Sequence, residues 1–168
     1  MNIERLDELT EKDLHQLSRG LMASVEDGAS LGFLKGFSLV KALSYWNNLS
    51  QHLGDGLFLL VARDQGEIIG SVQLEKCNKE NGLHRAEVQK LFVLPTHRRK
   101  NVASKLMIKV SKLAYENGVR LMVLDTQTDS KAEQFYQQQE WQKSGEIPSF
   151  ALSPEGKLCD TSYYYKSV

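Results

Sequence analysis

The sequence has no excess of either charge. Its 21 Lys and Arg residues balance 21 Asp and Glu residues over 168 positions, so the formal net charge is zero. Binding nucleic acid over a broad surface requires a net basic face. We therefore expect no nucleic-acid partner, although salt-sensitive binding through the local basic run at residues 97–100 would be the alternative.

Cysteines are scarce. The only two, Cys77 and Cys159, lie far apart and form no CxxC motif, which excludes a disulfide framework or a structural zinc site. We expect no bound metal. Neither cysteine has a histidine or a basic cluster beside it in the sequence, so we expect neither to carry an acyl group.

Long apolar runs are also missing. None approaches the roughly 20 residues that a membrane span needs, and the first residues, MNIER, are polar and charged without the apolar core of a signal peptide. These absences predict a cytoplasmic protein with no membrane partner. The phosphate-binding motifs GxxxxGK[ST] and GxGxxG are absent as well.

What is present is an alternation of strand and helix periodicities, typical of a layered α/β (α+β) domain, here expected to be a single one over residues 1–168. A capping box at Thr10 and Asp13 predicts a helix that ends near Gly28. Further helices are expected at 38–52, 102–117 and 130–139, and strands at 2–6, 57–63, 68–77, 85–94, 119–124 and 161–166. Within the exposed loop expected at residues 26–37, the segment 28–33, with glycines at 28 and 32, is a candidate substrate lid or a plain connection between helices.

The most informative unit is a strand, a basic turn and a helix, which read AEVQKLFVLP, THRRKNVAS and KLMIKV. The first N–H groups of a helix have no partner within the helix, and the helix dipole favours an anion there. Such a turn is a natural phosphate cradle, to which basic side chains add charge-assisted contacts. A solvated basic loop would show the same pattern.

This turn carries a family resemblance. The run Arg98 to Ala103, RRKNVA, resembles the Q/R-x-x-G-x-G/A pyrophosphate loop of the GNAT superfamily of acyl-CoA-dependent N-acyltransferases. Arg98 and Ala103 match that pattern, whereas Asn101 replaces the usual glycine. Asn is among the residues that best tolerate left-handed backbone, so the departure concerns coenzyme A affinity more than fold.

A second segment supports the resemblance. SKAEQFYQQQEW, at residues 130–141, resembles the family pattern A-x-x-x-Y-x-x-x-G-F. Ala132 and Tyr136 match, and Glu140 and Trp141 replace the Gly and the Phe. The resemblance implies the GNAT fold, a mixed and mostly antiparallel sheet of six to seven strands flanked by about four helices.

The resemblance also implies acetyl-CoA as the co-substrate. In the family the strand before the basic turn splays from its neighbour, so that a backbone N–H near Phe92 or Val93 would stabilise the oxyanion. The residues that it places against the coenzyme are Leu91, Phe92, Val93, Arg98, Arg99, Lys100, Asn101, Val102, Ala103, Ser104, Asp129 and Ala132.

Three residues are candidates for acid–base chemistry. By resemblance, Tyr136 faces the coenzyme sulfur and protonates the leaving thiolate; the alternative is a helix tyrosine that only packs on the core. Glu87, a carboxylate in an apolar strand, would be the base or hold the substrate ammonium, unless it forms an ion pair with Arg85 or Lys90 or faces outward at a sheet edge. Asp125 ends the apolar run at 119–124, where α/β sheets place ligands, and is the other candidate base unless it caps a turn.

Stretches at residues 27–33, 81–95 and 124–136 resemble a toxin-resistance branch of the superfamily, which acetylates an amino-acid-like β-lactam. This implies an N-acetyltransferase of a small, amino-acid-like primary amine, acting by direct attack in a ternary complex. The alternatives are a non-catalytic acyl-CoA-binding sensor and an acetyltransferase of protein or peptide amines. The tyrosine-rich last strand could pair with a second copy to form a homodimer.

Overall fold

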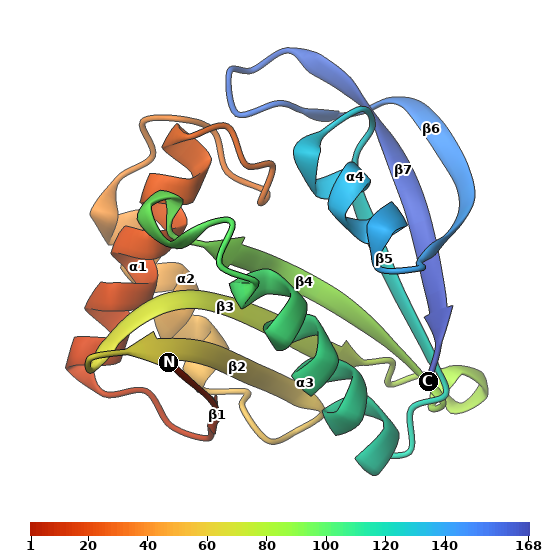
Figure 1. Ribbon diagram of the computed structural model, residues 1–168, viewed down its shortest axis with the longest axis horizontal. Coiled ribbons are helices and arrows are strands. Elements are labelled where there is room, and N and C mark those ends of the chain that lie inside the picture. Colours follow the sequence, from red (N-terminus) through yellow and green to blue (C-terminus); the bar gives the residue numbers. More distant parts are fainter.

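A computed structural model describes all 168 residues (Figure 1). Its centre is a seven-stranded sheet in the order β1-β2-β3-β4-β5-β7-β6. All neighbours are antiparallel except β4 and β5, which are parallel. The strands are β1 Asn2–Leu6, β2 Leu57–Asp64, β3 Glu67–Lys76, β4 Arg85–Val93, β5 Leu121–Gln127, β6 Gln142–Leu152 and β7 Leu158–Ser167.

Four α-helices accompany the sheet: α1 Glu11–Glu26, α2 Leu39–Ser50, α3 Val102–Glu116 and α4 Lys131–Gln138. The expected mixed, mostly antiparallel fold is therefore confirmed. The predicted capping box at the start of α1 is also present, because the Asp13 N–H donates to the Thr10 hydroxyl at 3.1 Å and the Thr10 N–H donates to the Asp13 carboxylate at 3.1 Å.

The helices cover both faces of the sheet (Figure 1). One apolar cluster, with Leu17 and Leu21 of α1 and Trp46 of α2, lies on what we call the α1/α2 face. The other cluster, which includes Leu106 of α3 and Tyr136 of α4, lies on the α3/α4 face. Burial of these stripes fixes which way each strand residue points, and so which face each candidate site residue occupies.

Strands β4 and β5 pair over a short stretch only. Arg85–Glu87 register with Leu121–Val123, and beyond them the two strands diverge (Figure 1). Residues 88–93 of β4 therefore have no strand partner on the side of β5, which leaves main-chain groups free there. The family resemblance implied this splay between neighbouring strands.

Three sequence-based expectations need correction. Strand β6 was not expected: nearly all of it is exposed, it contains Pro148, and its pairing with β7 shifts register twice, so apolar alternation does not mark it. Strand β5 runs on to Gln127, so Asp125 lies inside the strand. Strand β7 lies between β5 and β6, so the expected pairing of two copies through this strand is wrong because both of its edges are occupied. No helix is both long enough and apolar enough to cross a membrane.

Candidate active site

The turn before α3 has the backbone of an anion cradle. Asn101, the N-cap residue of α3, has φ 59° and ψ 19°, the left-handed conformation expected of a residue that replaces glycine. Its side chain makes no capping hydrogen bond. The first N–H groups of the helix, on Val102, Ala103 and Ser104, therefore have no side-chain cap and can receive an anion.

The three basic residues of the turn differ in what they contact. The Arg98 guanidinium forms an ion pair with Asp27 and donates to the Val93 carbonyl at 3.3 Å, which ties the turn to the end of α1 and to β4. The hydrogen bond from Arg98 lowers the pKa of the Asp27 carboxyl. Arg99 and Lys100 are exposed and form no ion pair, so these two cations are available to phosphates.

The end of β4 is held between the two apolar clusters. Phe92 packs in the cluster of α1 and Val93 in that of α3, while Leu91 is half-buried. The fit is close, since a Cβ on Gly20 of α1 would lie 2.6 Å from the Phe92 ring. This packing fixes the main chain of β4 at the splay, where an oxyanion donor would have to be rigid.

The opposite wall of the splay comes from β5 and α4. Ala132 is exposed in the first turn of α4, and Asp129 precedes it with a left-handed φ of 59°. The Asp129 N–H donates to the Glu133 carboxylate at 2.6 Å. Both expected coenzyme contacts are therefore at the start of α4, across the opening from β4.

Tyr136 lies on the α3/α4 face and is 7% exposed. Its ring packs edge-on against Trp141, with centroids 5.9 Å apart, and against Phe135 at 5.4 Å. Burial, assisted by the negative charge of Asp125, raises the pKa of the Tyr136 hydroxyl. The group stays protonated at neutral pH, which is the state that a general acid requires.

Glu87 and Asp125 share the α1/α2 face. Glu87 is opposite Val123 in the parallel pairing, and Asp125 lies two residues further along the same strand. Burial raises the pKa of Glu87, and the charges of Asp125 and Glu75 raise it further. Desolvation also raises the pKa of Asp125, which keeps access to solvent, against the lowering effect of Lys90. Carboxyl groups whose pKa is raised in this way are candidates for proton transfer.

The structure contradicts the alternative that Glu87 forms an ion pair with Arg85 or Lys90. Arg85 donates to the Cys77 sulfur at 3.4 Å, and neither Arg85 nor Lys90 forms an ion pair with Glu87. The contact corrects one expectation about Cys77, because a backbone hydrogen bond at Lys79 and the nearby Arg85 lower its pKa. Cys77 nevertheless follows β3 at the opposite end of β4 from the cradle.

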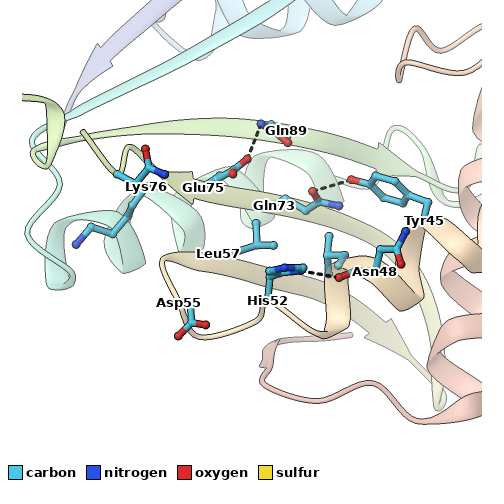
Figure 2. Close-up of a pocket in the computed structure, with 11 residues that line it drawn as sticks. Tyr45, Asn48, His52, Asp55, Leu57, Gln73, Glu75, Lys76 and Gln89 are labelled. Carbon is cyan, nitrogen blue, oxygen red and sulfur yellow. Dashed lines mark hydrogen bonds between the residues drawn. The ribbon is translucent and has the colours of Figure 1, made fainter. Parts of the chain in front are cut away.

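A groove of about 420 Å³ lies on the α1/α2 face, between α2, the loop that follows it, and strands β2, β3 and β4 (Figure 2). Within it the Gln89 amide donates to Glu75 at 3.1 Å, and the Tyr45 hydroxyl donates to Gln73 at 2.9 Å. Most of its lining residues are polar or charged, and one of them, Glu75, is the β3 partner of Glu87. It is lined by Tyr45, Asn48, Leu49, His52, Asp55, Leu57, Gln73, Glu75, Lys76, Asn78 and Gln89.

The loop between α1 and α2 reaches across the splay. The Lys35 N–H donates to the Pro154 carbonyl at 2.8 Å, and the Lys35 ammonium pairs with Glu155 at 2.7 Å. Both partners belong to the turn between β6 and β7. The loop that contains the expected lid segment, residues 28–33, is therefore joined through Lys35 to the turn between β6 and β7.

Sequence reasoning missed two residues of this region. Glu133 is 3% exposed and accepts hydrogen bonds from the Tyr164 hydroxyl at 2.8 Å and the Lys143 ammonium at 3.1 Å. Burial alone would raise its pKa, but these bonds, with those from Ser162 and Asp129, lower it to about 2. The S-x-x-E spacing from Ser130 was the available signal. The second residue, Lys90, was considered only as a partner of Glu87.

An uncapped helix start that follows a splayed strand is the arrangement that the resemblance to acyl-CoA-dependent transferases implied. The model of the Acetyltransferase (GNAT) family matches residues 21–141, and the chain belongs to this family. It is an acetyl-CoA-dependent acyltransferase, and the uncapped start of α3 with its two free cations fits the coenzyme's phosphates.

Relatives and solved structures agree with this assignment. The chain is 31% identical over 127 residues to an uncharacterized N-acetyltransferase in the hisH-hisA intergenic region of Azospirillum brasilense, covering 74% of each chain. The fold is similar to that of ribosomal-protein-alanine N-acetyltransferase from Brucella melitensis, with a TM-score of 0.79, 19% identity and all of both chains covered. It is also similar to yncA from Salmonella typhimurium, solved with its cofactor acetyl-CoA, with a TM-score of 0.76, 15% identity and 99% and 94% of the two chains covered.

Proposed function

We propose that this protein transfers the acetyl group of acetyl-CoA to a primary amine of a small, amino-acid-like molecule by direct attack in a ternary complex. The observation that carries the proposal is the distribution of acid–base groups about the splay. Glu87 and Asp125 lie on the α1/α2 face, whereas Tyr136 lies on the α3/α4 face. An amine and a thioester could thus be held together between a base and an acid.

Each group has one task in this reaction. One of the two carboxylates, directly or through a water, takes a proton from the substrate ammonium, and the freed nitrogen attacks the acetyl carbonyl carbon. The new C–N bond forms as the C–S bond breaks, and the nitrogen loses its second proton to solvent to become the amide. Tyr136 gives its proton to the departing thiolate and is reprotonated from solvent, so that the products are the acetamide and coenzyme A.

The co-substrate would bind at the start of α3 and along the end of β4. The N–H groups of Val102, Ala103 and Ser104, with Arg99 and Lys100, would receive the pyrophosphate. A free main-chain N–H of Phe92 or Val93 would receive the carbonyl oxygen as it gains charge. Arg98 would act indirectly, since its guanidinium holds the turn against Asp27.

A small acceptor is favoured by enclosure. The contact of Lys35 with the β6–β7 turn, here called the clasp, would limit access from that side, and the groove of about 420 Å³ on the α1/α2 face is of the size that holds small molecules. A protein substrate would need this clasp to open. The stretches at residues 27–33, 81–95 and 124–136 also resemble the tabtoxin resistance protein, an acetyltransferase of an amino-acid-like β-lactam toxin.

The test is a thiol-release assay with acetyl-CoA and a panel of amino acids, polyamines, aminoglycosides and β-lactam amino acids. We expect amine-dependent release of coenzyme A, reduced by ~100-fold or more in Tyr136→Phe. Tyr115→Phe, at an exposed tyrosine of α3, is the matched control and should retain full activity. Binding of acetyl-CoA without turnover of any amine would contradict the proposal and support a sensor.

A further inference from the structure

Lys90 occupies an irregular position in β4. The register between β3 and β4 shifts by one residue between Ser71 and Gln73, and Lys90, within the resulting bulge, has a φ of 50°. A lysine in this conformation costs on the order of 1 kcal/mol. Bulges commonly redirect a side chain, and here the bulge turns Lys90 to the α1/α2 face beside Glu87.

The Lys90 ammonium has aromatic and glycine neighbours but no anion. It lies 5.5 Å from the centroid of the Tyr45 ring, which is held by the hydrogen bond from its hydroxyl to Gln73. Gly32 of the α1–α2 loop is also close, since a Cβ on it would lie 3.5 Å from the ammonium nitrogen. Phe33 packs edge-on against Tyr45 at 5.5 Å and completes the wall.

The Lys90 ammonium has no anionic partner within the chain. Burial lowers the pKa of Lys90 although the charges of Asp125 and Glu87 oppose that shift. No carboxylate forms an ion pair with it. A partly desolvated ammonium is costly unless an anion joins it, so the arrangement is suited to receiving one from outside the chain.

The α1/α2 face therefore carries charges of opposite sign that are close but not paired. Glu87 and Asp125 are close enough to influence Lys90 electrostatically but do not neutralise it. A ligand with an ammonium at one end and a carboxylate near it would complement both. We propose that Lys90 binds a carboxylate of the acceptor, so that the substrate is a zwitterionic amine with its ammonium at Glu87 and Asp125. This inference rests on the proposed function and specifies the substrate class.

Lys90 could instead serve only to keep the two carboxylates ionised. In that role its loss would slow all amines alike and move the acid limb of the pH–rate profile to higher pH. As a carboxylate site, its loss would act on carboxylated amines selectively and mainly through KM. The two roles are therefore separable by experiment.

The experiment measures kcat and KM for amino acids paired with their decarboxylated amines: lysine with cadaverine, ornithine with putrescine, and histidine with histamine. We expect the wild type to prefer the carboxylated member of its best pair. Lys90→Met should reduce that preference by roughly 10- to 100-fold, the usual effect of losing a hydrogen bond to a charged group. Lys90→Arg should restore part of it, because it keeps the charge.

The matched control is Lys41→Met, which removes an exposed cation 5.9 Å from the centroid of the neighbouring Phe33 ring and should keep the preference. Equal losses for both members of each pair, or no loss, would overturn the carboxylate site. Turnover of polyamines without turnover of any amino acid would overturn it too, yet leave acetyl transfer intact. If no amine of any kind is acetylated, the proposed function itself fails.

Discussion

The proposed cofactor cradle and the proposed acceptor site are built in opposite ways. The cradle comes from one continuous segment, residues 98–104, whose helix start would supply the donors. The acceptor site would collect side chains from several elements: Tyr45 of α2, Glu87 and Lys90 of β4, and Asp125 of β5. The first requires only a local backbone conformation, whereas the second requires the whole sheet to be in register.

Because the two regions are built differently, substitutions in them should have different effects on binding and turnover. Changes in the cradle should affect acetyl-CoA affinity and leave the KM of the amine alone. Changes among the carboxylates should affect turnover of the amine and leave acetyl-CoA affinity alone. A substitution that moved both quantities equally would show that the two regions are not independent.

The largest effect is expected from the carboxylates. At least one of Glu87→Gln and Asp125→Asn should lower kcat/KM for the amine by ~100-fold or more, because proton removal by a positioned base contributes that much. Acetyl-CoA affinity, measured by calorimetry, should stay within about twofold. Glu116→Gln, at an exposed position near the end of α3, serves as the control. Small losses in both carboxylate variants would mean that neither is the base.

The pH profile tests the same pair. The base acts only when ionised, so activity should fall as pH drops through a raised pKa, above the ordinary value of about 4 for a carboxyl group. Since the charge of Asp125 helps to raise the pKa of Glu87, Asp125→Asn should lower it. If Glu87 is the base, the acid limb of kcat/KM moves to lower pH in that variant, and an unmoved limb would contradict this role.

Glu133 stabilises α4, the helix that carries Tyr136. Replacing it with Gln removes a charged acceptor from Tyr164, Lys143 and the Asp129 N–H, and should lower the free energy of unfolding by about 2 kcal/mol. Denaturant titrations measure this loss. Glu146→Gln, which removes the exposed second partner of Lys143, should cost under about 1 kcal/mol.

The pKa of Glu133, lowered to about 2, also gives the sign of a pH dependence. A carboxyl with a depressed folded-state pKa stabilises the protein above its unfolded value of about 4.3, and that contribution is lost as pH falls toward 2. The difference in stability between wild type and Glu133→Gln should therefore shrink over this window. A constant difference would contradict the role of the charge.

A smaller effect is expected at Asn101. Because its φ is 59°, Asn101→Gly should bind acetyl-CoA at least as tightly as the wild type. Asn101→Val, β-branched in a left-handed conformation, should weaken binding about tenfold, equivalent to the ~1–2 kcal/mol that such strain costs. Calorimetry measures both variants. Equal affinity in the two would show that the conformation of this turn does not control coenzyme binding.

The sequence predicts the cradle better than the proposed acceptor site, and the reasons are physical. Helical periodicity and the turn before α3 are local, so the left-handed Asn101 and the start of the helix could be expected. Strand β6 could not be predicted, since it is exposed on both faces and held by pairing with β7. The role of Lys90 could not be predicted either, because the direction of its side chain depends on a bulge relative to β3. The approach of Lys35 to the β6–β7 turn likewise depends on how distant segments pack.

The central claim is that acetyl-CoA and the amine are bound at the same time, the coenzyme at the cradle before α3 and the amine at the acceptor site on the α1/α2 face. Initial rates with acetyl-CoA and the best amine varied together, with mass spectrometry of the product, test it most directly. Intersecting double-reciprocal lines and acetylation of the amine alone are predicted for direct attack in a ternary complex. Parallel lines with an acetyl group retained on the protein, at Cys77 or elsewhere, would contradict it.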